Sequence, residues 1–123
     1  MASSALGKIY QDGEVIIQQG DEGHCMFVIQ EGRVEVVQQV NGKEVQLGIR
    51  GEGEYVGEMA IFEREVRSAT VRALGEARVL TVDQKNFLRR VAEDPSLAFS
   101  LVQNLSARLR ESSKLISELK SNG

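Results

Sequence analysis

One short segment of the chain, GEMAIFEREVRSATV at residues 57–71, carries side chains whose types and spacing could bind a small charged molecule. Arg67 could grip a phosphate through two parallel hydrogen bonds from its planar guanidinium. Glu58, nine residues earlier, would repel a phosphate but could accept a hydrogen bond from a sugar hydroxyl. The small residues Ser68 and Ala69 would let a ligand approach the backbone. Together these groups suit a ligand that holds one phosphate and one hydroxyl close together.

The start of the same segment could add backbone donors. Gly57 and Glu58 lead into the apolar run 59–62, which could be a strand end that turns into one helical turn. Exposed N–H groups at such a start can bind an anion. The alternative is a structural ion pair between Glu58 and Arg67, which the spacing alone favours because surface ion pairs are common.

Short strands separated by glycines are predicted to position this segment. Ten of the twelve glycines fall between Gly13 and Gly75, where turns need a positive φ. Asn41-Gly42 is typical of a two-residue hairpin turn. The expected strands are 15–17, 26–29, 33–40, 43–49 and a closing pair at 68–74 and 77–82, with a loop at 51–54. Strands of this length and spacing favour an antiparallel roll, barrel or sandwich over residues 8–82.

Helical periodicity replaces this pattern at Asp83. Asp83 is a candidate N-cap for a helix over 83–94 that stops at Asp94-Pro95. Asp94 is then the candidate N-cap of a second helix over 95–121, with Pro95 at its first position. Spacings of alternately four and three residues form a heptad seam in this helix, with one serine among apolar residues. The seam is Ala98, Val102, Leu105, Leu109, Ser112, Ile116 and Leu119.

Length and charge limit what the chain can be. With 123 residues it can bury one hydrophobic core, so we expect a single domain over 1–123. The net charge of −3 divides into −5 over residues 1–82 (8 Lys/Arg against 13 Asp/Glu) and +2 over 83–123 (7 against 5). An acidic body argues against direct binding of nucleic acid, which needs clustered Lys and Arg.

Apolar runs and cysteine usage favour a cytoplasmic location. The longest apolar run, 25–29, is too short to span a membrane, and the first residues lack the apolar core of an export signal. The single cysteine cannot form an intrachain disulfide. We therefore expect a reducing compartment and no membrane association.

Catalysis is not expected. The only histidine, His24, is predicted to lie in a loop beside Cys25, which we expect to be a small buried hydrophobic residue. The sequence has no other Cys or His to complete a metal site or a nucleophile–base pair. We therefore predict no enzyme activity, no metal and no cofactor.

In their order along the chain, these features resemble the cyclic nucleotide-binding domain family, which includes bacterial catabolite activator proteins and regulatory subunits of protein kinase A. Residues 57–61 (GEMAI) and 67–71 (RSATV) are similar to the family's phosphate-binding cassette. The early turns at 20–21 and 32–34 match in position, as do the two C-terminal helices. The resemblance covers nearly the whole chain and is closest to the bacterial branch.

The resemblance implies a fold and a role for each site residue. The fold is mainly β, a jelly-roll-like antiparallel β-roll followed by two α-helices. Arg67 would hold the cyclic phosphate with help from Ser68 and from backbone N–H groups near Ala60, and Glu58 would accept a hydrogen bond from the ribose 2′-hydroxyl. The implied ligand-binding residues are Gly57, Glu58, Met59, Ala60, Arg67, Ser68, Ala69, Val36, Leu47, Arg108, Ser112 and Ser113.

The base side of the site is implied to come from two regions. Val36 and Leu47 would line it from the roll, while Arg108 and the pair Ser112-Ser113 would lie near the purine. The implied function is regulatory: the domain binds a cyclic purine mononucleotide, with cyclic AMP favoured, and repositions its C-terminal helices. A homodimer through residues 98–119 is expected.

Several alternatives stay open at this point. The ligand could be cyclic GMP, or the chain could be a dimerisation module that binds no nucleotide. The final helix could fold back on the roll in a monomer, and the chain could be a stand-alone module or a fragment of a larger regulator.

Overall fold

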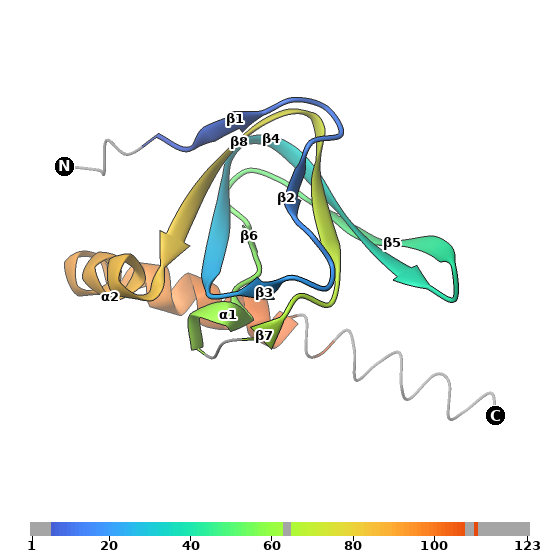
Figure 1. Ribbon diagram of the computed structural model, residues 1–123. Helices are drawn as coiled ribbons and strands as arrows, with labels where there is room; N and C mark the ends of the chain where they lie inside the picture. Colours follow the sequence, from blue (N-terminus) through green and yellow to red (C-terminus); the bar gives the residue numbers. More distant parts are fainter. Residues whose placement is uncertain (1–5, 63–64, 108–109, 111–123) are drawn as a thin grey trace. The chain divides into compact units, whose positions relative to one another are not determined.

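The computed structural model describes residues 6–62, 65–107 and 110, and its contacts divide the chain into two units, Met1–Phe87 and Leu88–Gly123. The first unit is an antiparallel β-roll (Figure 1). Its elements are β1 (Lys8–Tyr10), β2 (Val15–Ile17), β3 (Glu22–Gly23), β4 (Cys25–Val40), β5 (Lys43–Arg50), β6 (Tyr55–Val56), α1 (Met59–Phe62), β7 (Glu65–Val66) and β8 (Thr70–Asp83). The helix α2 (Gln84–Glu93) begins in the first unit and continues in the second.

Two long strands, β4 and β8, form the frame of the roll and pair antiparallel along most of their length (Figure 1). Each contains a glycine with a positive φ, Gly32 at 80° and Gly75 at 76°. The register shifts just before Gly32, between Ile29 and Glu31, and again across it, between Glu31 and Arg33, so the ladder bends there without ending. The prediction of separate short strands is therefore wrong, because glycine can bend a strand as well as end one.

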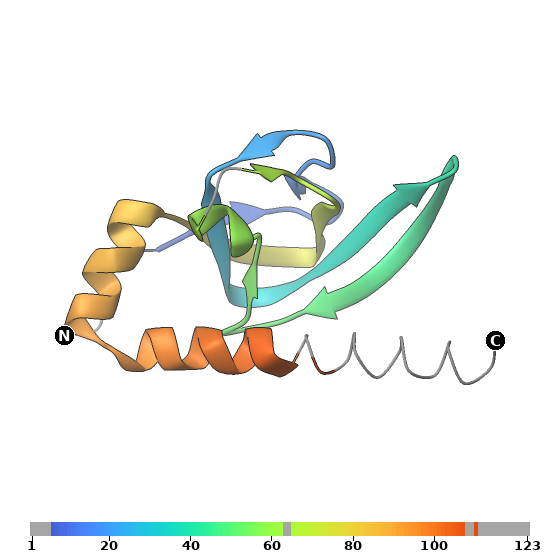
Figure 2. The same cartoon turned by 90° about the horizontal axis from the view of Figure 1, so that it is seen from below.

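The remaining strands complete one six-stranded sheet and one small sheet. The main sheet has the order β1-β8-β4-β5, with β2 also paired to β8 and β6 to β4, while β3 pairs with β7. The predicted two-residue hairpin between β4 and β5 is confirmed, since Asn41 and Gly42 have φ values of 53° and 79° and Val40 pairs with Lys43. Figure 2 shows this hairpin extending away from the rest of the roll.

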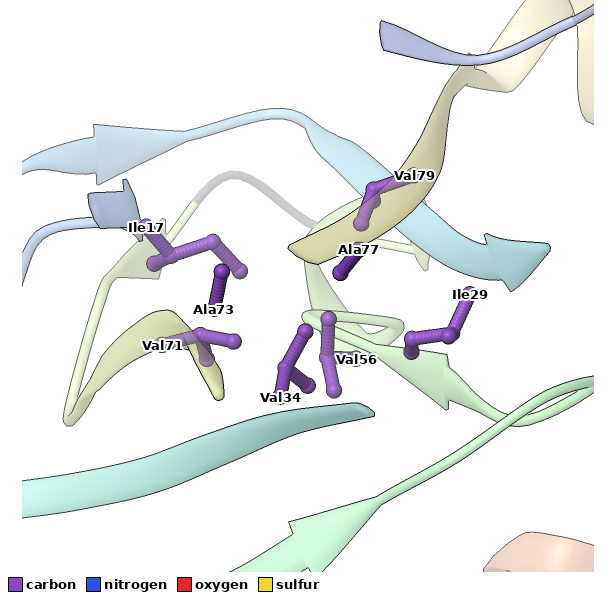
Figure 3. Packing of buried hydrophobic residues seen from close by; sticks show 8 residues of the cluster. All are labelled: Ile17, Ile29, Val34, Val56, Val71, Ala73, Ala77 and Val79. Atoms are coloured by element: carbon purple, nitrogen blue, oxygen red, sulfur yellow. The ribbon is translucent and has the colours of Figure 1, made fainter. Parts of the chain in front are cut away.

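Buried aliphatic side chains from four strands fill the interior of the roll. Ile29 and Val34 on β4 are fully enclosed, and Val79 on β8 is 1% exposed. Small and branched side chains let the strands approach closely. The cluster shown in Figure 3 consists of Ile17, Ile29, Val34, Val56, Val71, Ala73, Ala77 and Val79.

Both predicted helix caps are confirmed. Asp83 Oδ1 accepts a hydrogen bond from the N–H of Asn86 at 2.8 Å where α2 begins. In the second unit Asp94 Oδ1 accepts from the N–H of Ser96 at 3.1 Å, and residues 96–107 are helical. The seam positions beyond 107 lie outside the described residues. Within the described ranges, no helix combines the length and the apolar content that crossing a membrane requires.

The observed elements agree with the predicted fold class, a mainly β antiparallel roll followed by helices. That all 123 residues form one domain stays a prediction.

Candidate ligand-binding site

The segment singled out from the sequence opens as predicted, with a strand end followed by one helical turn. β6 ends at Val56, Gly57 follows with φ at 70°, and α1 comes after Glu58. The N–H of Ala60 donates to the carbonyl oxygen of Gly57 at 3.2 Å. A residue with a side chain would be strained at Gly57, because φ lies in the left-handed region.

Arg67 is the central side chain of the candidate site. It is only 7% exposed, yet its guanidinium bonds neutral groups: Nη1 donates to the carbonyl oxygen of Gly57 at 3.2 Å and Nη2 to that of Cys25 at 2.6 Å. The guanidinium carbon also lies 5.9 Å from the centre of the Phe27 ring. These contacts orient the cation without neutralising it, and a guanidinium has five N–H donors in all.

The ion-pair alternative for this segment is not supported by the structure. Between described residues, ion pairs are formed by Arg72 and Arg78, and a pair of Glu58 with Arg67 is not among them. Glu58 is nevertheless buried, with 6% exposed. A buried carboxylate and a buried guanidinium within ten residues of one another are unusual, because charged side chains are seldom fully buried.

Two glycines make room for the guanidinium. A Cβ atom at Gly23 would lie 2.0 Å from Nε of Arg67, and one at Gly57 would lie 2.6 Å from Nη1. Only glycine therefore fits at either position while Arg67 holds this conformation. Gly57 was identified from the sequence as a site residue, but Gly23 was not. The φ of Gly23 is not in the left-handed region, and glycine is needed there because the side chain of Arg67, from a distant segment, packs against it.

The turn before β4 holds the backbone of Arg67 as well as its side chain. The N–H of Arg67 donates to the carbonyl oxygen of Asp21 at 2.7 Å, and the N–H of Gly20 donates to that of Arg67 at 2.9 Å. With the bond to Cys25, residues 20–25 therefore contact Arg67 at three points. The sequence predicted a turn at Gly20 but gave no sign that this turn supports the site.

Polar side chains from the roll fix the residues that follow Arg67. Ser68 is exposed, and its carbonyl oxygen accepts a hydrogen bond from Gln38 Nε2 at 2.9 Å. Thr70 is 9% exposed, and its Oγ1 accepts from the N–H of Gln19 at 3.0 Å. Gln38 and Thr70 were not predicted, because their part in the site depends on contacts between strands.

The two residues predicted to line the base lie on adjacent strands. Val36 on β4 is half-buried and packs against the core cluster. Its partner on β5 is Gly48, whereas the next residue, Val37, pairs with Gln46. Leu47 is therefore the extra residue of a bulge, a feature that re-aims a side chain, and it is 53% exposed. Arg108, Ser112 and Ser113 lie outside the described residues, so their roles stay predictions.

A cavity of about 340 Å³ also borders Arg67. Its walls combine aromatic and aliphatic side chains, among them Tyr10, Ile16 and Phe27, with the polar residues of the turn before β4. Cys25 lines it too, and burial, followed by the charge of Asp83, raises the pKa of this thiol against the opposing effect of Arg67. Among the described residues, no group of three or more His, Cys, Asp or Glu could hold a metal ion.

Comparison with known proteins gives this geometry a family. Residues 8–94 match the model of the family described as "Cyclic nucleotide-binding domain". That span includes the roll, the segment 57–71 and α2, so Glu58 and Arg67 both fall within it.

Curated relatives of known function match over most of this chain. The cAMP-dependent protein kinase regulatory subunit of Schizosaccharomyces pombe is 40% identical over 81 residues, 66% of this chain and 19% of that protein. The Cyclic AMP receptor protein of Thermus thermophilus is 30% identical over 105 residues, 85% of this chain and 49% of that protein. The cGMP-dependent protein kinase egl-4 of Caenorhabditis elegans is 37% identical over 91 residues, 72% and 12% respectively. The chain thus spans at most about half the length of these relatives.

Solved structures show the same fold. The Catabolite Activator Protein of Thermus thermophilus superposes with a TM-score of 0.82 at 29% identity, over 92% of this chain and 54% of that one. The EAL enzyme Bd1971 has a cGMP-bound form (TM-score 0.64, 34% identity, 88% of this chain and 29% of that one). Its cAMP-bound form also has a TM-score of 0.64 at 34% identity, over 90% of this chain and 30% of that one. With the family model matched along most of its length, this chain belongs to the cyclic nucleotide-binding domain family, whose members are regulatory nucleotide-binding domains.

Proposed function

We propose that this chain binds one cyclic purine mononucleotide, preferably cyclic AMP, and transmits its presence by repositioning the C-terminal helices. The observation that carries the proposal is the buried Arg67, whose guanidinium is oriented by carbonyl oxygens and paired with no carboxylate among the described residues. A cyclic phosphate would supply the missing negative charge through a geometry that matches the guanidinium.

The remaining cassette residues take complementary roles in this proposal. Glu58 accepts a hydrogen bond from the ribose 2′-hydroxyl, and Ser68 assists Arg67 at the phosphate. Gly57, Met59, Ala60 and Ala69 bring the backbone close to the ligand, because three of the four have little or no side chain. Tethers to neighbouring strands, such as Gln38 Nε2 to the carbonyl oxygen of Ser68 at 2.9 Å, support this arrangement.

The choice of cyclic AMP rests on the base side. The names of the relatives include both cAMP-dependent and cGMP-dependent kinases, and Bd1971 is found with either nucleotide. We place Val36 and Leu47 against one side of the base, with Arg108 and the Ser112-Ser113 pair near the purine. A hydroxyl on the final helix can bond the adenine amino group, which favours cyclic AMP in the anti form.

Binding can switch the chain only by as much free energy as the nucleotide prefers one arrangement over the other. The seam 98–119 is the proposed place where the signal leaves, by pairing with a second copy. Val102, a seam position, supports this with 59% exposed, as does its neighbour Phe99 with 64%, because exposed apolar residues on a helix favour association. Sedimentation at micromolar concentration tests it: a dimer is expected, and a monomer with and without nucleotide would refute the pairing.

We further propose that the chain has no catalytic activity and needs no cofactor, since it has one histidine and one cysteine. With its acidic roll we expect no direct binding of nucleic acid or of a membrane, and the lone cysteine fits a cytoplasmic location.

Calorimetry with cyclic AMP and cyclic GMP side by side tests the function, with 5′-AMP as the control that lacks the cyclic phosphate. We expect one nucleotide per chain, tighter binding of cyclic AMP than of cyclic GMP, and the weakest binding for 5′-AMP. Absence of binding for both cyclic nucleotides would overturn the sensor proposal. A dimer in sedimentation would then favour the alternative, a dimerisation module without nucleotide.

A further inference from the structure

A second arginine near the site, Arg72 on β8, ties three strands together. Its Nε donates to Glu35 Oε1 on β4 at 2.5 Å. Its Nη1 and Nη2 donate to Oε1 and Oε2 of Glu44 on β5 at 3.0 and 2.6 Å. Gln46 Nε2, also on β5, donates to the other oxygen of Glu35 at 3.1 Å. The fork on Glu44 is bidentate, which is the arginine–carboxylate geometry with the greatest directional specificity.

The two strands of the hairpin are held from outside by different contacts. On β4, the N–H of Gln39 donates to Gln19 Oε1 at 2.8 Å and Gln38 Nε2 donates to the carbonyl oxygen of Ser68 at 2.9 Å, whereas β5 is held by Arg72. β5 is the edge strand of the sheet and, within the part of the chain that the structure describes, pairs with β4 alone. The pairing of β4 with β8 stops at Val37, so the hairpin beyond that point is a two-stranded ribbon, as Figure 2 shows. Two-stranded ribbons are marginally stable in water. Among the described residues, the ion pair that reaches β5 from outside the hairpin is that of Arg72 with Glu44.

The contacts of Arg72 with Glu35 and Glu44 lie next to the candidate site. Arg72 follows Val71, which pairs with Val36 across the β8–β4 ladder. Glu44 and Gln46 are the two β5 residues of this hydrogen-bond network. The bulge that carries Leu47 follows them along β5, on the side nearer the roll. A change in how the hairpin sits relative to β8 would therefore change where Leu47 lies relative to the cassette.

We propose that Arg72 is a positioning residue for the nucleotide: by holding Glu44 and Glu35 it fixes the β4–β5 hairpin relative to the site, so that Leu47 at the base of the hairpin covers the purine. This inference rests on the proposed function. Arg72 itself does not touch the ligand. Its loss should therefore speed nucleotide dissociation, because most affinity differences between variants of one binding site appear in the dissociation rate.

Four variants and one control test the role of Arg72. Arg72→Gln and Glu44→Gln each remove the bidentate pair, and the double variant completes a mutant cycle. Arg78→Gln is the matched control, since Arg78 lies on the same strand but bonds Gly7 and Glu31 instead of the hairpin. Arg72→Lys keeps the charge and loses the fork, so it should restore the effect only in part.

Two measurements are made on each protein. Amide hydrogen exchange of residues 43–47, without nucleotide, reports the hairpin itself. Stopped-flow displacement of a fluorescent cyclic nucleotide reports dissociation. For Arg72→Gln and Glu44→Gln we expect both rates to rise about three- to tenfold, with the double variant no worse than either single one. Arg78→Gln should leave both rates unchanged.

The outcomes separate this inference from the proposed function. Unchanged exchange of residues 43–47 in Arg72→Gln would show that Arg72 does not hold the hairpin, whatever the chain binds. Faster exchange with unchanged dissociation would show that the hairpin does not cover the ligand, which overturns the positioning role. If the parent chain binds no cyclic nucleotide, the proposed function fails together with this role, while the exchange data still decide whether the grip exists.

Discussion

Arg67 and Arg72 lie five residues apart on the same stretch of chain, and their surroundings are opposite. Arg67 is 7% exposed and bonds the carbonyl oxygens of Gly57 and Cys25. The Arg72 side chain is 30% exposed and bonds the carboxylates of Glu35 and Glu44. Water could solvate the charge of Arg72, yet the protein pairs it with carboxylates. Water barely reaches the charge of Arg67, yet Arg67 is not paired with a carboxylate among the described residues.

This contrast indicates different roles for the two arginines, with Arg67 binding the ligand and Arg72 holding the hairpin. The hydrogen bonds that Arg72 donates to Glu44 and Glu35 raise the pKa of its guanidinium well above its usual range, so its charge is fixed and already paired. Burying a cation without an anion is costly, and a protein retains such a group where a ligand completes it. The cassette thus uses an arginine to bind a ligand, whereas the β4–β5 hairpin uses an arginine to hold strands together.

The largest effect is expected at Arg67. Arg67→Ala should weaken cyclic nucleotide binding by about 2–5 kcal/mol, the usual cost of truncating one half of a buried charged pair. Arg67→Lys should restore it only in part, because an ammonium cannot reproduce the planar fork. Calorimetry measures both variants. If Arg67→Ala binds as tightly as the parent, the phosphate is held elsewhere.

The next effect concerns Glu58 and the sugar. The 2′-deoxy analogue of the nucleotide should bind the parent more weakly by about 1.5–3 kcal/mol, the value of a hydrogen bond to a charged group. For Glu58→Ala the two nucleotides should bind almost equally, because the contact is already lost. Calorimetry on the four combinations of protein and nucleotide measures these affinities. Additive losses would place the role of Glu58 away from the 2′-hydroxyl.

Gly23 tests whether the space around Arg67 is required. Gly23→Ala places a methyl group on the guanidinium, with Cβ 2.0 Å from Nε, and should lower the free energy of unfolding by about 1–3 kcal/mol, as overpacking does. Gly51→Ala is the matched control, because its Cβ would meet nothing closer than 3.9 Å. Urea unfolding and nucleotide affinity are measured for both. Full stability and affinity in Gly23→Ala would mean that Arg67 is free to adopt another conformation.

Ser112, in the predicted final helix, should set the purine preference. Ser112→Ala should weaken cyclic AMP about tenfold more than cyclic GMP, which is one hydrogen bond of about 1.4 kcal/mol. Competition binding with both nucleotides measures the difference. Equal weakening, or a greater loss for cyclic GMP, would overturn the preference for cyclic AMP and move the specificity to Ser68.

The smallest effect is the titration of Glu44. The hydrogen bond from Arg72 lowers the pKa of this carboxyl from its usual value. Because the folded pKa is depressed, the stabilisation is complete above the unfolded pKa and is lost as the pH falls through the folded value. NMR titration of the Glu44 carboxyl should show the lowered pKa in the parent and an ordinary one in Arg72→Gln. The same pKa in both proteins would remove the basis for the hairpin grip.

Local chemistry was enough to predict much of this molecule. The two-residue turn at Asn41-Gly42 and the caps at Asp83 and Asp94 depend on neighbours in the sequence, and all three are confirmed. The family and the fold class were also predicted, because the cassette residues occur in order between strand-like and helix-like segments.

Features that depend on long-range contacts were missed. Gly32 and Gly75 bend continuous strands, which looks from the sequence like the end of one strand and the start of the next. Gly23 is needed because Arg67 packs on it, and Gln38 matters because Ser68 lies beside it. No local signal marks such residues, since their partners are distant along the chain.

The most direct test of the contrast between the two arginines is NMR of their guanidinium groups during titration with cyclic AMP. We expect the Nη signals of Arg67 to shift and to become protected from exchange as the phosphate binds, while those of Arg72 stay in place. Unchanged Arg67 signals at saturating nucleotide, or a shift confined to Arg72, would contradict the assignment of Arg67 as the phosphate-binding residue.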